Sequence, residues 1–147
     1  MPLEPIEIRD CDDAAFSNRR ALDVDRHIAA DLGAETLRAI REGSYLLPDG
    51  RRVAWSESVA TAIAAKVTIP PDATLPGGTG GFASTSLTIA NETTLRAAKL
   101  MVGDGEKPLV LNMANGVTPG GGFLTGSRAQ EEVLCRSSAL HATLDGD

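Results

Sequence analysis

Two neighbouring stretches near the end of the chain carry residue types that could hold and cleave a phosphorylated ligand. Three consecutive glycines, Gly120 to Gly122, are followed after seven residues by Gln130-Glu131-Glu132. Glycine has no Cβ, so the backbone N–H groups of such a loop can reach ligand oxygens, and positive φ angles cost little. A carboxyl group can donate a proton or accept one. The combination indicates an anion-binding loop beside a general acid.

Each of these features also has an ordinary structural explanation. Three glycines between a strand and a helix are often only a tight connection, and acids in a first helical turn commonly just complement the helix dipole. For the acid pair alone, a solvated helix face is the more frequent arrangement. The glycine spacing differs from the dinucleotide-binding fingerprint, and no Gly-Lys-Ser/Thr follows to make a P-loop. Their combination in one short window favours a ligand site.

The elements that would position this window follow from apolar periodicity and turn residues. The apolar run 109–113 predicts a central strand, and Ser127 predicts the N-cap of a helix over 128–144 with the acids in its first turn and a half. The other predicted elements are a helix over 18–42 with a possible break at Gly33 and a stop at Gly43, a hairpin of 44–47 and 51–55 around Pro48-Asp49-Gly50, a helix over 57–66 capped by Ser56, a strand over 84–90, and a helix over 92–101 capped by Asn91.

The order of these elements predicts an α/β fold. From residue 84 onward, strand, helix, strand and helix alternate, which is typical of a parallel sheet. We divide the chain into a helical and hairpin extension over 1–75, packed on the core, and the first part of the core over 76–147, within one structural unit. Because the sequence predicts only two parallel strands before Asp147, we expect further strands and helices in a longer polypeptide.

Composition narrows the class of protein. The chain has 147 residues, of which 42% are hydrophobic and 23% charged, as expected for one globular domain. A net charge of -6 disfavours general binding to DNA or RNA. No apolar run approaches the roughly 18 residues of a membrane span, and no secretory signal is visible. Cys11 and Cys135 lie far apart, which predicts thiols, and Cys135 is expected to be a buried packing residue. We therefore expect a cytoplasmic protein that binds neither nucleic acid nor membrane.

The glycine and acid window resembles the signature of the poly(ADP-ribose) glycohydrolases, whose catalytic core is a macrodomain. The resemblance to the bacterial-type members covers most of residues 20–144. The similar stretches are Val110 to Asn115, Pro119 to Leu124, Arg128 to Glu132, Leu134 to Leu140, Glu35-Thr36-Leu37, Gly43-Ser44-Tyr45 and Asn91 to Leu95. The resemblance implies a macrodomain-like mixed sheet flanked by helices, with an N-terminal helical and hairpin extension.

The same resemblance implies residue roles. Glu132 matches the catalytic acid, and Glu131 matches the acid that holds the ribose next to the scissile bond. Asn115 matches an asparagine at the terminal ribose. The implied substrate-binding residues are Asn115, Gly120, Gly121, Gly122, Phe123 and Gln130, with Gly120 to Phe123 around the diphosphate. A second phosphate loop and an aromatic that stacks on adenine are expected beyond residue 147.

The implied reaction is hydrolysis of the ribose–ribose O-glycosidic bonds of poly(ADP-ribose), releasing ADP-ribose, with a glutamate as acid and base. The ligand diphosphate can help to stabilise the cationic transition state, and no residues have metal-ligand spacing, so no metal or cofactor is expected. The implied partners are poly(ADP-ribose) or ADP-ribose, ADP-ribosylated proteins in the DNA damage response, and the C-terminal remainder of the same polypeptide. Two alternatives stay open: a macrodomain that binds ADP-ribose without cleaving it, and a structural α/β domain without a ligand.

Overall fold

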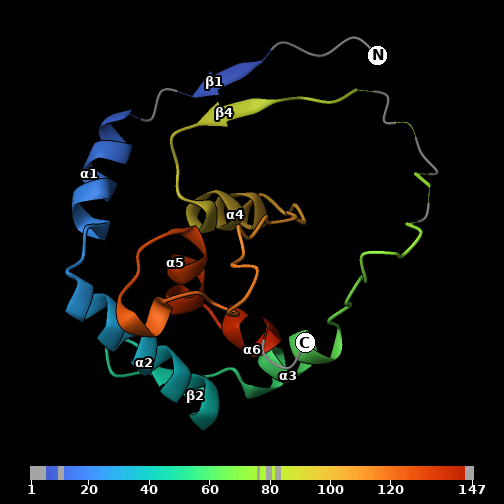
Figure 1. The fold of residues 1–147 in the computed structure, drawn as a ribbon. Helices are drawn as coiled ribbons and strands as arrows, with labels where there is room; N and C mark the ends of the chain where they lie inside the picture. The colour runs from blue at the N-terminus through green and yellow to red at the C-terminus, as the bar shows by residue number, and fades with distance from the viewer. Residues whose placement is uncertain (1–5, 10–11, 76, 79–80, 82–83, 145–147) are drawn as a thin grey trace. The chain divides into compact units, whose positions relative to one another are not determined.

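The computed structural model of the chain describes residues 6–9, 12–75, 77–78, 81 and 84–144, so the predictions for Cys11 and for the residues after 144 lie outside it. Figure 1 shows the elements along the chain. They are β1 (Glu7–Arg9), α1 (Asp12–Leu22), α2 (Arg26–Glu42), β2 (Ser44–Leu46), β3 (Arg52–Ala54), α3 (Ser56–Ala64), β4 (Thr88–Ala90), α4 (Thr94–Gly103), the 3-10 turn η1 (Phe123–Thr125), α5 (Gln130–Ser137) and α6 (Leu140–Leu144).

Two compact units are interleaved along the chain. The first consists of Met1–Asp23 and Ile69–Val110, and the second of Val24–Thr68 and Leu111–Asp147. The second unit contains the glycine loop and the acids. The predicted division into an extension over 1–75 and a core over 76–147, packed together as one structural unit, stays a prediction.

The first unit contains a parallel pair of strands, β1 and β4. Glu7 lies opposite Thr88 in the register of the two strands. The strand predicted over 84–90 is thus confirmed in its last three residues. Helix α4 follows, and its N-cap is Thr93, whose side chain accepts a hydrogen bond from Arg96 N. The predicted cap Asn91 is wrong by two residues, because the hydroxyl of Thr93 supplies the acceptor oxygen closer to the helix.

The central strand predicted over 109–113 does not form. Residues 106–115 have no regular secondary structure, and Leu109 is 100% exposed. A strand needs a neighbour for its backbone N–H and C=O groups. Among the described residues, the only strand pairs are β1 with β4 and β2 with β3, so this segment has no strand partner. The apolar pattern led to the prediction of a strand, but the pattern alone does not form one without a neighbouring strand.

In the second unit, α2 packs against η1 and α5 (Figure 1). The helix ends at Gly43, whose φ of 67° confirms the predicted stop. Its N-cap is Asp25, which accepts a hydrogen bond from His27 N, so the predicted helix over 18–42 is two helices that separate before Asp25. The break predicted at Gly33 is wrong, because α2 continues through it. The glycine is explained by packing, since a Cβ there would stand 2.8 Å from the carbonyl oxygen of Phe123.

The predicted hairpin is confirmed by the antiparallel pair β2 and β3, with Tyr45 opposite Val53. Tyr45 and Trp55 make an edge-to-face ring contact with centroids 5.0 Å apart. Trp55 also donates from Nε1 to the carbonyl oxygen of Ala39, which attaches the hairpin to α2. The predicted cap Ser56 is wrong: Trp55 occupies the cap position, and Ser56 is the first residue of α3.

The helix predicted over 128–144 is divided into α5 and α6 at Ser138. The Ser138 hydroxyl donates to Leu134 O and accepts from Leu140 N, and so ends one helix and begins the other. The cap position of α5 is Ala129, and the predicted cap Ser127 is wrong. At Ser138, therefore, the side chain competes with the helix for backbone hydrogen bonds. No helix in the described part of the chain has the length and apolar character needed to cross a bilayer.

Candidate active site

The two acids of α5 lie in its first turn and are buried. Glu131 is 3% exposed and Glu132 is 9% exposed. A solvated helix face, the more frequent arrangement for such a pair, is therefore not the one found. Because a buried carboxylate is costly unless it accepts hydrogen bonds, the partners of each oxygen indicate its role.

Glu131 accepts hydrogen bonds from three residues of the second unit. Its Oε2 accepts from the backbone N–H of Asn115 at 2.7 Å. Its Oε1 accepts from the backbone N–H of Gly120 at 3.1 Å and from Nδ2 of Asn112 at 3.5 Å. The carboxylate thus joins the beginning of α5 to the segment before the glycine loop and to the loop itself.

Glu132 has one occupied oxygen and one free oxygen. Its Oε1 accepts from the backbone N–H of Gly122 at 3.1 Å. Its Oε2 is buried and has no hydrogen-bond partner among the described residues. One oxygen is therefore held in place while the other can carry a proton, which is the arrangement required of a general acid.

The glycine loop is shaped by the protein's own side chains. Gly120 and Gly121 have φ angles of 76° and 54°, in the left-handed region that favours glycine. A Cβ on Gly121 would collide with Oε1 of Glu132, and one on Gly120 would stand 2.9 Å from the ring of His141. The loop also uses its N–H groups internally, since Gly121 donates to Thr118 O while its two neighbours hold the acids.

The remaining predicted ligand residues have distinct surroundings. Phe123 is 2% exposed, and its ring lies against His141 with centroids 4.9 Å apart, so its side chain belongs to the core. Asn115 is exposed, and its Oδ1 accepts from the N–H groups of Val117 and Thr118, each at 2.9 Å. This local turn leaves Nδ2 of Asn115 as its outward donor. The substrate-binding roles of these residues stay predictions.

Gln130 uses its side-chain amide on the backbone. Nε2 donates to Leu111 O at 2.7 Å, and Oε1 accepts from Met113 N at 2.7 Å. The structure thus brings together Gln130, Glu131, Glu132, Asn115 and the glycine loop, as the sequence predicted. The contacts of Gln130 with the backbone were not predicted, because no sequence pattern indicates such a partner for a glutamine in a first helical turn.

The sequence indicated no role for Asn112 or for His141. Oδ1 of Asn112 is buried without a hydrogen-bond partner among the described residues, while its Nδ2 faces Glu131. His141 lies against Gly120 and Phe123. The only sequence signal for Asn112 is its position three residues before Asn115, and for His141 there is none.

Cys135 lies beneath the acids, one helical turn along α5. Its side chain is fully buried, which confirms the predicted packing thiol. Burial, and then the negative charges of Glu131 and Glu132, raise the pKa of the Cys135 thiol from 9.0 to about 11. Because the thiolate is the nucleophile, this cysteine is unsuited to covalent catalysis near neutral pH.

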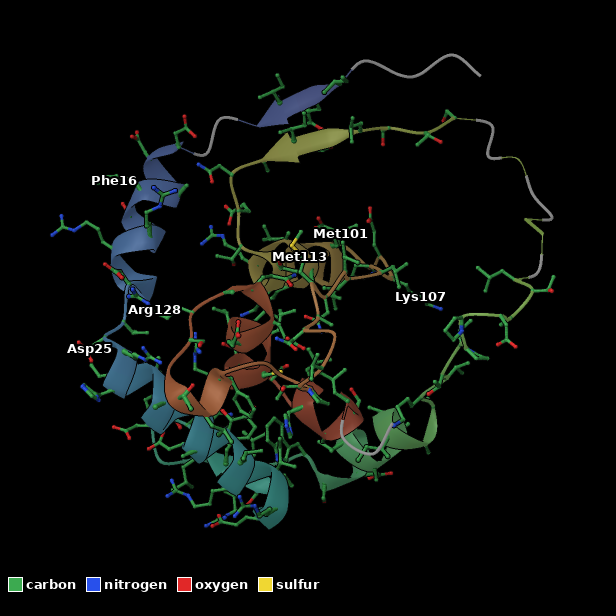
Figure 2. All side chains as sticks on the ribbon, viewed as in Figure 1. Phe16, Asp25, Met101, Lys107, Met113 and Arg128 are labelled. Atoms are coloured by element: carbon green, nitrogen blue, oxygen red, sulfur yellow. The ribbon has the colours of Figure 1, made fainter. Side chains whose placement is uncertain are left out.

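Arginine side chains hold the loop between the glycines and α5. Arg26 donates from Nε to Thr125 O at 2.9 Å, and Arg128 donates from Nη1 to Val24 O at 3.1 Å. Figure 2 labels Arg128 beside the beginning of α2, where Asp25 is also labelled. Both arginines thus attach the segment between the glycines and α5 to the beginning of α2.

The fold and the site define an α/β protein with a buried acid pair beneath a glycine loop. Residues 33–146 match the family model described as microbial-type PARG, catalytic domain. The chain belongs to this family, and the resemblance seen in the sequence is confirmed. A comparison with curated proteins found no match.

Solved structures of poly(ADP-ribose) glycohydrolase from Thermomonospora curvata are similar to the chain. The X-ray crystal structure is 36% identical with a TM-score of 0.71, covering 80% of this chain and 45% of that chain. A glutamate-to-alanine mutant is 32% identical with a TM-score of 0.66, and the enzyme bound to the inhibitor ADP-HPD is 32% identical with a TM-score of 0.62. Each of these covers 80% of this chain and 43% of the solved chain. The chain thus spans less than half the length of the solved structures that it matches.

Proposed function

We propose that the protein hydrolyses the ribose–ribose O-glycosidic bonds of poly(ADP-ribose) and releases ADP-ribose. The observation that carries the proposal is the state of Glu132: a buried carboxyl with Oε1 held by Gly122 and Oε2 without a partner. Membership of the microbial-type PARG family and the similarity to the Thermomonospora curvata enzyme support the substrate class.

In the proposed mechanism, Glu132 acts first as acid and then as base. Oε2 donates its proton to the ribose oxygen that leaves, while the bond from that oxygen to the anomeric carbon breaks through an oxocarbenium-like transition state. The resulting carboxylate takes a proton from water, whose oxygen bonds to the anomeric carbon. The Gly122 N–H holds Oε1 through both steps, while the buried Oε2 must come within reach of the leaving oxygen and of water when the substrate binds.

The other site residues bind the substrate in this proposal. Asn115 donates to the terminal ribose from its exposed amide. Gly120 to Phe123 lie along the diphosphate, and their N–H groups, which bond within the protein in this structure, must be shared with the phosphate oxygens on binding. The ring of Phe123 is buried and does not contact the ligand. Glu131 accepts three hydrogen bonds from the protein. A carboxylate has about four lone-pair sites, so one remains for a ribose hydroxyl. The substrate's own diphosphate helps to stabilise the cationic transition state.

The decisive experiment compares Glu132→Gln with wild type in the full-length protein. We expect release of ADP-ribose from poly(ADP-ribose) to fall by about 100- to 10,000-fold, the usual contribution of a general acid. Affinity for ADP-ribose, measured by calorimetry, should stay nearly unchanged. Glu35→Gln is the matched control, because Glu35 is an exposed acid of α2 whose side chain is 62% exposed.

The outcomes separate the alternatives. Undiminished hydrolysis by Glu132→Gln would remove Glu132 from the mechanism. Wild-type protein that binds ADP-ribose without releasing it from the polymer would be a macrodomain that binds and does not cleave. Equal loss of binding and hydrolysis would assign Glu132 a structural role.

We further infer that this activity serves in the cytoplasm and in the DNA damage response, where ADP-ribosylated proteins would be its substrates. The negative net charge of -6 disfavours direct binding to DNA. Cells that lack the gene should accumulate poly(ADP-ribose) after DNA damage. Unchanged polymer levels, or recovery of the protein outside the cytoplasmic fraction, would contradict this assignment.

A further inference from the structure

The amide of Gln130 takes the place of a neighbouring strand. It pairs with Leu111 O and Met113 N, the carbonyl before Asn112 and the N–H after it. A residue of a parallel strand opposite Asn112 would bond with the same two groups. A glutamine side chain carries the same donor and acceptor as a peptide unit. The segment that was predicted as a strand, and that has no strand partner among the described residues, is therefore held by a side chain.

The contacts continue residue by residue along the first turn of α5. Glu131 binds the N–H groups of Asn115 and Gly120, and Glu132 binds that of Gly122. One helical turn thereby sets the position of the segment before the loop, of the loop, and of the catalytic carboxyl relative to one another. Of the three side chains in this turn, Gln130 makes the contacts that lie earliest in the chain, at Leu111 and Met113.

We propose that Gln130 is a positioning residue: its amide clamps Leu111 to Met113 and so places Asn115 for the ribose beside Glu132. This inference rests on the proposed function of Glu132. It gives Gln130 a role through the backbone, because Nε2 and Oε1 each bind a backbone group at 2.7 Å, whereas the sequence predicted a direct substrate contact.

The clamp requires one donor and one acceptor, which makes it testable by pH. In Gln130→Glu, an ionised carboxylate keeps the acceptor for Met113 N but places a second oxygen against Leu111 O. The protonated carboxyl has an O–H donor and restores both hydrogen bonds. The carbonyl oxygen opposite it favours the protonated form, so the introduced group should titrate above the usual value of about 4.3 for glutamate.

The experiment uses the full-length protein with Gln130→Met, Gln130→Glu and the control Ala129→Glu, which adds a carboxylate at the exposed neighbouring position. Two quantities are measured: hydrogen-exchange protection of the Met113 amide, and kcat for release of ADP-ribose, each from pH 5 to pH 8. We expect Gln130→Met to lose the protection and to lower kcat by about 100-fold at every pH, the typical effect of a misplacement near 1 Å. Gln130→Glu should match it at pH 8 and approach wild type as the pH falls. Ala129→Glu should follow wild type.

Equal protection of Met113 in Gln130→Met and wild type would overturn the proposal, as would a Gln130→Glu variant without recovery in acid. If Gln130→Met does not fold, Gln130→Glu compared with Ala129→Glu at two pH values carries the test. The exchange measurement needs no catalysis. A wild-type protein without hydrolysis would therefore contradict the proposed function, while the protection pattern would still decide the role of Gln130.

Discussion

Two glycine-rich segments of the chain look alike in sequence and differ in their surroundings. Residues 75–81 contain Pro-Gly-Gly, and residues 119–122 contain Pro-Gly-Gly-Gly. A Cβ added to Gly77 or Gly78 would meet nothing within 4 Å. A Cβ added to any glycine of the second segment, Gly120 to Gly122, would collide with a side chain or press closely on one. The same residue type therefore provides an open connection in one place and room for a buried carboxyl in the other.

This contrast shows the structural role of the triple glycine. The sequence indicated that something approaches this backbone closely, and a ligand was the expected partner. In the structure the closest partner is the carboxyl group of Glu132, because its Oε1 occupies the space where a Gly121 side chain would be. The glycines thus let the acid lie beneath the loop, at a depth where its free oxygen is shielded from water.

The strongest test of this comparison is Gly121→Ala. The φ of 54° and the collision with Glu132 should together lower the free energy of unfolding by about 3 kcal/mol, the sum of left-handed strain and overpacking. Hydrolysis should fall by about 100-fold or more, because the methyl group displaces the acid. Unfolding in urea and ADP-ribose release measure the two effects. Gly50→Ala is the control, since Gly50 has a φ of 83° with nothing within 4 Å. An equal loss of stability in both variants would show strain alone.

The thiol beneath the acids predicts a pH effect of intermediate size. Because the pKa of Cys135 is raised from 9.0 to about 11, the folded protein keeps this proton after the unfolded chain has lost it. Stability from this group is therefore complete below pH 9 and is lost as the pH rises to about 11, by on the order of 2 kcal/mol. Urea unfolding from pH 8 to pH 11 measures it. Cys135→Ala should lack this part of the decline, and an identical decline in that variant would contradict the burial of the thiol.

Gly122→Ala should have a smaller effect. The φ of Gly122 is -97°, so the cost comes from contact with the Ser127 hydroxyl and not from the backbone. We expect a loss of about 1–2 kcal/mol. In the double variant with Ser127→Ala, about 0.5–1 kcal/mol of it should return, as expected for residues in contact. A double-mutant cycle by thermal unfolding measures this coupling, and simple additivity would show that the serine is not the obstacle.

The smallest effect is predicted for the open segment. Gly78→Ala meets no neighbour, and no positive φ is needed there, so stability should change by less than about 0.5 kcal/mol. Hydrolysis should equal that of wild type. A large loss of activity in this variant would remove the contrast between the two glycine segments and would indicate that residues 75–81 also contact a functional group.

The predictions that held depend on neighbours in sequence. Gly43 ends α2 because a left-handed residue at that position accommodates the last turn, and Pro48-Asp49-Gly50 closes the hairpin through its own turn geometry. The predictions that failed depend on distant partners or on competing side chains. Residues 109–113 had the apolar pattern of a strand but no strand to pair with, and Ser138 divided a helix whose pattern continued beyond it.

The family, the order of glycine loop and acid pair, and the candidate proton donor could all be predicted from the sequence, because spacing along one chain is enough to identify a signature. How the two acids differ could be seen only in the folded protein. Glu131 is occupied by donors from three residues, whereas Glu132 keeps a free oxygen, and Gln130 holds the backbone of a segment about twenty residues earlier. These contacts join residues that are separated in sequence, and adjacent, identical side chains acquire different chemistry from the donors that the fold brings to each.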